Sequence, residues 1–186
     1  MKQFALSFIF IFFIQCSNTN TPRYSTTPME VETLIGEEGE TVILGSLNRA
    51  NLNTEEFLFW FQLEYDRLEI PTAWTEAHFP LAENLKFKLF LGTWCGDTQR
   101  ELGGIFKILD ALGVQESQLE MYALSELKDS PLGYEKEYDI LNIPTLIFFE
   151  NGKELNRIVE FPVESLLEDF SKILKKEPYK DAYADF

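Results

Sequence analysis

Runs of apolar and β-branched residues predict five strands along the chain. Most of these runs border a glycine, proline or asparagine, the residues that commonly bound strands. The runs lie at residues 40–45, 86–91, 119–124, 144–149 and 154–160. In the second run, Phe87, Leu89 and Leu91 share one face while Phe90 lies on the other. A strand that is apolar on both faces is usually central in a sheet covered on both sides, and we expect this position for it.

Apolar residues at steps of three and four predict helices between these strands. The helical segments lie at residues 57–68, 99–112, 132–141 and 163–174, and the third has the weakest pattern. Thr54 is placed to cap the first helix and Pro71 to stop it. Residues 72–85 are predicted to be irregular and to be anchored by large side chains. The expected anchors are Trp74, Phe79 and Leu81.

Glycines mark three further features of the pattern. Gly103 and Gly104 interrupt the second helix, which indicates a bend or close packing against a neighbour. Gly113 is placed to end that helix as a C-cap. Asn151-Gly152 is a strong hairpin signal and predicts that the last two strands are antiparallel. The resulting order, βαβαβαββα, indicates the α/β class with a central mixed sheet flanked by helices on both faces.

Length and charge limit the possible functions. The chain has 186 residues and a formal net charge of −15, from 31 acidic and 16 basic side chains. This length supports one domain with a proper core and short appendages. The excess of acid argues against binding to nucleic acid or to an anionic membrane surface, and solubility is its simplest explanation.

The amino terminus has the pattern of an export signal. A positive start at residues 1–3 precedes an apolar run at residues 4–14, which is shorter than the roughly 20 residues that span a bilayer. The run stops at Cys16 and resembles a bacterial lipoprotein signal, although Gln15 stands where a small residue is usual. This resemblance implies removal of residues 1–15, lipid on Cys16, and membrane anchoring in the cell envelope facing the periplasm. The alternative is an ordinary cleaved signal peptide.

A flexible tether is predicted after the signal. Residues 16–30 are rich in Ser, Thr, Asn and Pro and show no apolar period. The folded domain is expected to span residues 31–177, followed by a tail at residues 178–186 without a clear element.

Cysteine and histidine counts argue against a metal site. The chain has two cysteines, Cys16 and Cys95, and one histidine, His78, which stands alone and is expected at the surface or an interface. No metal and no cofactor are therefore expected. If Cys16 carries lipid or is removed, Cys95 is the only thiol of the mature chain and no internal disulfide can form.

The segment from Thr93 to Thr98, Thr-Trp-Cys-Gly-Asp-Thr, lies between a predicted strand and a predicted helix. Unpaired N–H groups of the first helical turn and the helix dipole favour the reactive thiolate of Cys95. The negative charge of Asp97 opposes thiolate formation while suiting a helix N-terminus, and the sequence leaves the balance open. The alternative is a small buried cysteine that only fills space.

Three motifs together resemble those of thioredoxin-fold proteins, and most of all the thioredoxin-like lipoproteins of Bacteroidota-type bacteria. They are Gly92–Thr98, Asn142-Ile-Pro-Thr145 and Asn151-Gly152, and the resemblance spans residues 40–175. It implies that Cys95 is the catalytic nucleophile, shielded by Trp94, with Pro144 in the cis form opposite the sulfur. It also implies that substrate binds along Trp94, Gly96, Ile143 and Pro144.

Three positions depart from the family pattern. Thr98 replaces the second cysteine, and its hydroxyl is predicted to donate a hydrogen bond to the thiolate as a second catalytic residue. Leu89 replaces a buried acid, and Gly103 replaces a helix-kinking proline. The first hypothesis is therefore a cell-envelope monothiol oxidoreductase that acts on an exported protein or a small thiol. The second is a non-catalytic binding or scaffold lipoprotein; the oligomeric state stays open.

Overall fold

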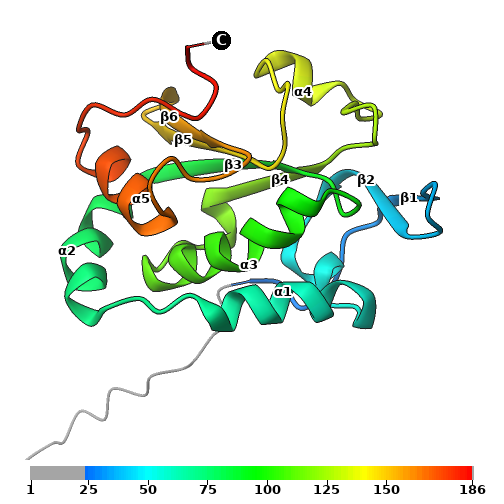
Figure 1. Cartoon of the computed structure of the whole chain (residues 1–186), viewed down its shortest axis with the longest axis horizontal. Helices are drawn as coiled ribbons and strands as arrows, with labels where there is room; N and C mark the ends of the chain where they lie inside the picture. The colour runs from blue at the N-terminus through cyan, green and yellow to red at the C-terminus, as the bar shows by residue number, and fades with distance from the viewer. Residues whose placement is uncertain (1–23, 186) are drawn as a thin grey trace, which may run out of the picture.

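A six-stranded mixed sheet runs through the molecule in the order β1-β2-β4-β3-β5-β6 (Figure 1). The computed structural model describes residues 24–185, so the expected signal peptide and Cys16 lie outside the described residues. The strands are β1 (Glu32–Ile35), β2 (Thr41–Leu47), β3 (Leu85–Leu91), β4 (Leu119–Ala123), β5 (Thr145–Glu150) and β6 (Lys153–Val159). The central position predicted for β3 is confirmed, because it pairs with β4 in parallel and with β5 in antiparallel orientation.

The helices flank this sheet unequally. They are α1 (Glu55–Arg67), α2 (Thr72–Ala82), α3 (Gly96–Ala111), α4 (Tyr134–Glu137) and α5 (Leu166–Leu174), with short 3₁₀ turns at Arg49–Leu52 and Glu116–Gln118. Figure 1 shows α4 on one side of the sheet and the other four helices on the opposite side. The predicted flanking on both faces is confirmed, although a single helical turn and its loops cover one of them.

Two apolar clusters correspond to the two faces of β3. Phe87 and Leu89 belong to the larger cluster, which includes side chains of α1, α3 and α5. Phe90 belongs to a smaller cluster that includes Cys95 and Ile143, with the rings of Tyr134 and Tyr138 packed against it. Side chains two residues apart in a strand point to the same face, and adjacent side chains point to opposite faces. The alternating side chains of β3 therefore belong to different clusters.

The connection of these elements gives the thioredoxin fold that the sequence predicted. A β3–α3–β4 unit has its two strands parallel, and a β5–β6–α5 unit adds an antiparallel hairpin beside β3. The first predicted strand, observed as β2, pairs antiparallel with β4. The strand β1, which pairs with β2, was not predicted, because all four of its residues are exposed and it therefore has no buried face.

Close packing between α1 and α3 explains the paired glycines. A Cβ atom added to Gly103 would lie 2.4 Å from the backbone N of Tyr65 and 2.5 Å from the carbonyl O of Phe61. Only a residue without a side chain allows the two helix backbones to approach so closely. Of the two predicted explanations, packing against a neighbour is therefore the one that the structure supports. The C-cap prediction for Gly113 is also confirmed, with a φ of +74° and its N–H donated to the carbonyl O of Asp110.

The prediction that residues 72–85 are irregular is wrong, because residues 72–82 form α2. Of the predicted anchors, Trp74 packs partly buried against the larger cluster, whereas Phe79 and Leu81 are 49% and 40% exposed. The buried side chains of α2 are His78 and Ala82. His78 is buried rather than at the surface. Its Nε2 lies 2.8 Å from the Ser171 hydroxyl and its Nδ1 lies 2.6 Å from a backbone carbonyl O of the preceding turn. Both ring nitrogens are thus paired, which offsets the cost of burying them.

Two predicted helices are shorter than expected. The segment predicted at 132–141 is helical only over α4, because Gly133 and Asp139 at its ends take positive φ values of 68° and 51°. The last helix begins at Leu166, since the Ser165 side chain caps it by accepting from the N–H of Glu168. The Thr54 cap of α1 is confirmed in the same way, because its side chain accepts from the N–H of Phe57.

The chain on both sides of the domain lies against it. In the part of the predicted tether that is described, the hydroxyl of Tyr24 donates to the carbonyl O of Val114. Asn51 exchanges two hydrogen bonds with the backbone of Met29. Residues 24–29 therefore contact the domain instead of standing free. Residues 178–185, the described part of the tail, contain no helix or strand, as predicted, and the Tyr179 hydroxyl donates a hydrogen bond to Asp169.

Candidate functional site

Cys95 lies where the sequence places it, between β3 and α3. It is the N-cap residue of α3, and its carbonyl O accepts the N–H of Gln99 at 3.0 Å. Its own N–H donates to the carbonyl O of Gly92, which closes a tight turn after β3. Cys95 is 9% exposed. The backbone of Cys95 thus begins α3, next to the unpaired N–H groups of the first turn, while its side chain makes no capping hydrogen bond to them.

Two side chains before Cys95 fix the turn to neighbouring strands. The Thr93 hydroxyl donates to the carbonyl O of Thr41 at 2.8 Å and accepts from the N–H of Ile43 at 3.2 Å. The indole N–H of Trp94 donates to the carbonyl O of Leu124 at 2.9 Å, just beyond the end of β4. These contacts attach the cysteine to β2 and β4, so it is held by the sheet rather than by a free loop.

The segment before β5 meets the cysteine. The Ile143–Pro144 peptide bond is cis, the form that the family resemblance implied. The thiol of Cys95 donates to the carbonyl O of Ile143 at an S···O distance of 3.5 Å. Ile143 and Pro144 are buried, and Trp94 is half-buried. The structure therefore brings together three of the four expected substrate-binding residues with the expected nucleophile.

The remaining two expected site residues lie in the first turn of α3. Gly96 is exposed, and a Cβ atom added there would meet no other atom within 4 Å. Thr98 is fully buried, and its hydroxyl accepts from the N–H of Gly92 at 3.2 Å. Among the described hydrogen bonds, none joins Thr98 to the sulfur of Cys95. Its observed contact holds the turn before Cys95, and the predicted bond to the thiolate does not appear.

Asp97 is paired with a cation. Its carboxylate forms an ion pair with Arg100 on the next turn of α3, and Arg100 also pairs with Glu101. The hydrogen bonds to Glu101 and to Asp97 raise the pKa of Arg100. The guanidinium of Arg100 therefore compensates part of the negative charge of Asp97 at the start of α3.

Glu160 and Tyr183 border the same site, although no sequence pattern marks either residue. The N–H of Glu160 donates to the carbonyl O of Pro144 at 2.7 Å. The hydroxyl of Tyr183 donates to the Glu160 carboxylate, and this bond raises the pKa of Tyr183 to about 12. Tyr183 belongs to a tail without any motif, so only the folded chain shows that it lies beside Pro144.

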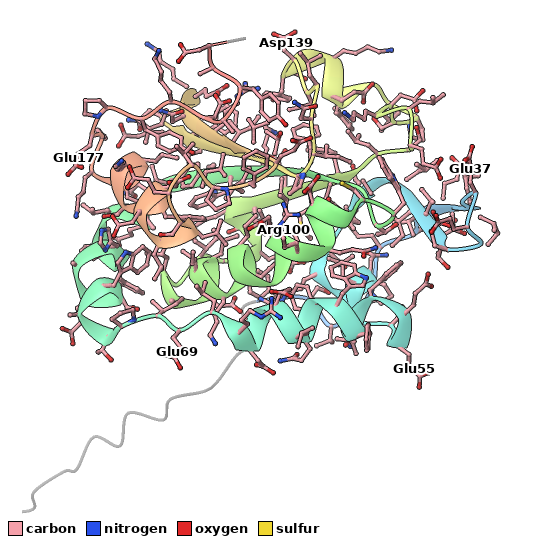
Figure 2. All side chains as sticks on the ribbon, viewed as in Figure 1. Glu37, Glu55, Glu69, Arg100, Asp139 and Glu177 are labelled. Carbon is pink, nitrogen blue, oxygen red and sulfur yellow. The ribbon has the colours of Figure 1, made fainter. Side chains whose placement is uncertain are left out.

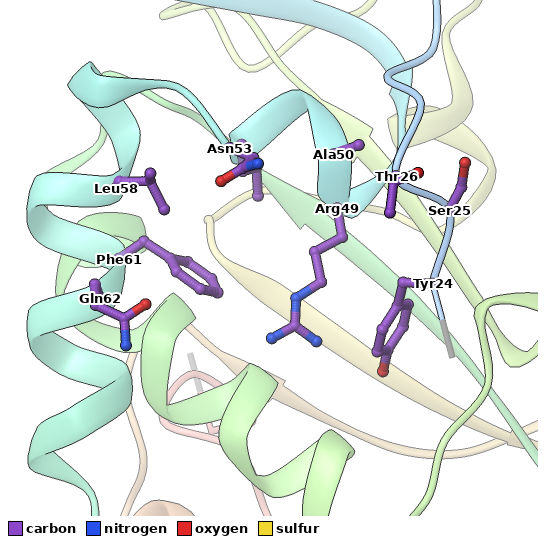
Figure 3. A pocket seen from close by; sticks show the side chains of 10 residues that line it. Tyr24, Ser25, Thr26, Arg49, Ala50, Asn53, Leu58, Phe61 and Gln62 are labelled. Carbon is purple, nitrogen blue, oxygen red and sulfur yellow. The ribbon is translucent and has the colours of Figure 1, made fainter. Parts of the chain in front are cut away.

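A separate pocket of about 270 Å³ lies toward the other end of α3 (Figure 3). Figure 3 shows the guanidinium of Arg49 between the rings of Tyr24 and Phe61. That guanidinium forms two hydrogen bonds with Asp110, near the last turn of α3, at 2.7 and 2.8 Å. Its charge is therefore already matched within the protein, and the pocket is distinct from the surroundings of Cys95.

No group of three or more His, Cys, Asp or Glu side chains within residues 24–185 is arranged to hold a metal ion. No helix in the same range is long and apolar enough to cross a membrane.

Comparison with known proteins gives limited similarity. No protein-family model and no curated protein matches the chain. A protein of unknown function from Pseudomonas aeruginosa is similar in structure, with 17% identity and a TM-score of 0.44 over 68% of this chain and 76% of that one. Mitochondrial thioredoxin 3 from Saccharomyces cerevisiae, in its oxidised form, has 20% identity and a TM-score of 0.32 over 52% of this chain and 86% of that one. At these scores the assignment of the fold rests on the strand order and connections described above.

Proposed function

We propose that this chain is a thioredoxin-like thiol–disulfide oxidoreductase of the monothiol type, with Cys95 as the nucleophile. One observation carries the proposal: Cys95 is the N-cap residue of α3, and its sulfur lies 3.5 Å from the carbonyl O of Ile143, directly before the cis Pro144. A helix N-terminus favours the thiolate, and the neighbouring backbone of Ile143 offers polar groups to an extended substrate.

The reaction is a two-step exchange. The thiolate of Cys95 attacks one sulfur of a substrate disulfide, the S–S bond breaks, and its electron pair leaves with the departing thiolate. The product is a mixed disulfide between Cys95 and the substrate. An external thiolate then attacks this bond, releases Cys95, and itself enters a new disulfide. The external thiol supplies the electrons, and it is a small thiol, a second cysteine of the substrate or a partner reductase.

The residues around the sulfur explain why an external thiol must resolve the mixed disulfide. Cys95 is the free cysteine of the described residues, and the position three residues on is Thr98. A hydroxyl cannot attack a mixed disulfide in place of a thiolate. The exchange therefore stops at the mixed disulfide unless another molecule supplies a thiol.

The proposed location is the cell envelope, and the proposed substrate is an exported protein. Lipid on Cys16 anchors the chain in the cell envelope facing the periplasm, where exported proteins carry disulfides. Residues 24–29 contact the domain, so a span before residue 24 would connect the lipid to it. Substrate lies along Trp94, Gly96, Ile143 and Pro144.

A Cys16→Ala variant tests the anchor: it should lose lipid incorporation and globomycin-sensitive processing, and unchanged processing would contradict the lipoprotein assignment.

The second candidate function is a non-catalytic binding module. Two observations favour it: Cys95 is only 9% exposed, and the Thr98 hydroxyl contacts Gly92 instead of the sulfur. In this case the surface around Pro144 holds an extended segment by backbone hydrogen bonds, as an edge strand does.

Intact-mass analysis separates the two functions. A Cys16→Ser chain, in which Cys95 is the only thiol, is incubated with a peptide that carries a mixed disulfide. We expect a covalent adduct at Cys95 that forms faster than on the same chain unfolded in denaturant and disappears when a small thiol is added. The Cys16→Ser, Cys95→Ser chain is the control and should give no adduct.

Reaction no faster than in the unfolded chain would contradict catalysis and support the binding module. In that event, binding of a cysteine-free peptide to the folded chain would be measured next, since a binding module retains that activity.

A further inference from the structure

Another pocket lies between the β1–β2 hairpin and the loop that follows β4. Its volume is about 160 Å³, and its apolar walls come from Leu34, Ile35, Val42 and Leu127. Ile35 and Leu127 are 75% and 87% exposed, so these walls stand open to solvent. An engineered apolar cavity of about 150 Å³ in another protein holds a benzene molecule, so this volume suits one bulky side chain.

Three hydrogen bonds connect the segments that line the pocket to the turn that holds Cys95. Leu124, whose carbonyl O accepts the indole N–H of Trp94, directly precedes the loop that lines the pocket. Val42 lies between Thr41 and Ile43, and both of these residues bond to the Thr93 hydroxyl. The segments that line the pocket are therefore attached to the same turn that holds the sulfur.

The rim of this pocket is acidic. Glu126 lines it, and Glu37 and Glu38 lie in the β1–β2 turn, with Glu37 at the outer end of the hairpin in Figure 2. All three side chains are exposed, and within residues 24–185 none of them takes part in an ion pair. The nearby ammonium of Lys128 is directed away, toward the carbonyl O of Leu141 at 2.9 Å. The rim thus offers uncompensated negative charge around an apolar centre.

We propose that this pocket determines which substrates Cys95 accepts, by binding a bulky apolar side chain that stands beside Lys or Arg in an extended segment of a partner protein. The apolar side chain lies a few residues from the cysteine that Cys95 attacks. This inference rests on the proposed thiol–disulfide exchange and adds its substrate class. Apolar burial provides attraction, and opposite charge at the rim increases the rate of encounter.

The same charge disfavours anionic substrates. A small thiol or disulfide with several carboxylates meets Glu126 at the pocket and Glu37 and Glu38 in the adjoining β1–β2 turn. Like charges in contact reduce association, and added salt weakens the effect. The preferred substrate is therefore cationic as well as apolar.

The test compares peptide disulfides that release a chromogenic thiol when Cys95 attacks them. Four peptides combine Leu or Ser near the cysteine with Lys or Glu beside that position, and the full Cys16→Ser chain is used throughout. We expect the Leu-Lys peptide to react about tenfold faster than the Ser-Glu peptide. An Ile35→Ser, Leu127→Ser variant should lose the preference for Leu. A Glu37→Gln, Glu126→Gln variant should lose the preference for Lys and its salt dependence.

Two controls make the outcomes distinguishable. Phe59→Ser changes a side chain that is 81% exposed on α1, away from the pocket, and should leave all four rates unchanged. A small uncharged disulfide reports the reactivity of Cys95 itself and should react equally with every variant. Equal rates for the four peptides, with normal reaction of the small disulfide, would overturn the pocket assignment alone. If the small disulfide reacts no faster than with the unfolded chain, the thiol–disulfide function itself fails.

Discussion

Thr98 is the single residue that separates this site from a dithiol site. Residues three apart on a helix have Cβ atoms about 5–6 Å apart, and a disulfide needs Cα atoms within about 4.4–6.8 Å. In the Cys16→Ser background, a Thr98→Cys variant should therefore close an internal disulfide with Cys95 under mild oxidation. The measurement is the number of thiols that remain alkylatable, which should fall from two to none and recover after reduction.

The control for this variant is Thr98→Ser, which keeps a hydroxyl to accept from the N–H of Gly92. It should fold normally and keep its one thiol. If Thr98→Cys is folded and retains both thiols after oxidation, the sulfur of Cys95 is not directed toward the first turn of α3, and the monothiol assignment loses its geometric basis.

For single residues, the sequence predicts which segments lie close together better than it predicts which hydrogen bonds form between them. The meeting of Cys95 and Ile143 was predictable, because a motif after one strand and a motif before an adjacent antiparallel strand lie at the same end of a sheet. The partner of the Thr98 hydroxyl was not, because it depends on the path of the backbone at Gly92. The hydrogen bond between Tyr183 and Glu160 was also not predictable, since the two residues share no motif.

The contact between α1 and α3 shows what single residues contribute to an element. Gly103→Ala places a Cβ atom 2.4 Å from the backbone N of Tyr65, where no flexible side chain can move aside. Overpacking of this kind costs about 1–3 kcal/mol, and the gain in helix propensity of roughly 1 kcal/mol offsets only part of it. We therefore expect a lower free energy of unfolding, measured by urea denaturation.

Gly96→Ala is the matched control on the same helix. No atom lies within 4 Å of the Cβ position there, so its stability should change by less than about 0.5 kcal/mol. If Gly103→Ala is as stable as the unmodified chain, the two helices are not in the close contact described above.

Elements with a strong period were the predictable part of the fold. β3 shows apolar residues on both faces, and the hairpin of β5 and β6 follows from Asn151-Gly152. The helix α2 was missed because its buried face consists of Trp74, His78 and Ala82, a set that does not look apolar in sequence. β1 was missed for a different reason: it is paired along one edge and exposed on both faces, so hydrogen bonds alone define it.

Acidic side chains surround the whole molecule. Figure 2 shows Glu37, Glu55, Glu69, Asp139 and Glu177 at its periphery, and acidic residues exceed basic ones by 31 to 16. Added negative charge therefore meets repulsion from the rest of the protein, which destabilises the folded state. Tyrosines are the groups that would add such charge at alkaline pH.

Because of its buried and half-buried tyrosines, we expect the protein to lose stability at alkaline pH. Burial and neighbouring carboxylates raise the pKa of Tyr179, and burial also raises the pKa of Tyr122, relative to the ordinary value near 10. Above about pH 10 these phenols ionise in the unfolded chain while they keep their protons in the folded one. The unfolded state then binds fewer protons, so the free energy of unfolding falls as the pH rises. Below that pH the stabilisation is fully present.

Urea denaturation at a series of pH values measures this decline. A Tyr179→Phe variant loses the hydrogen bond to Asp169, so it should be less stable than the unmodified chain at neutral pH. It should also decline less steeply above about pH 10, because one of the groups that releases its proton on unfolding has been removed. The two curves should therefore converge at high pH. Curves that stay parallel throughout would show that Tyr179 ionises equally in both states and is not held by Asp169 in the folded tail.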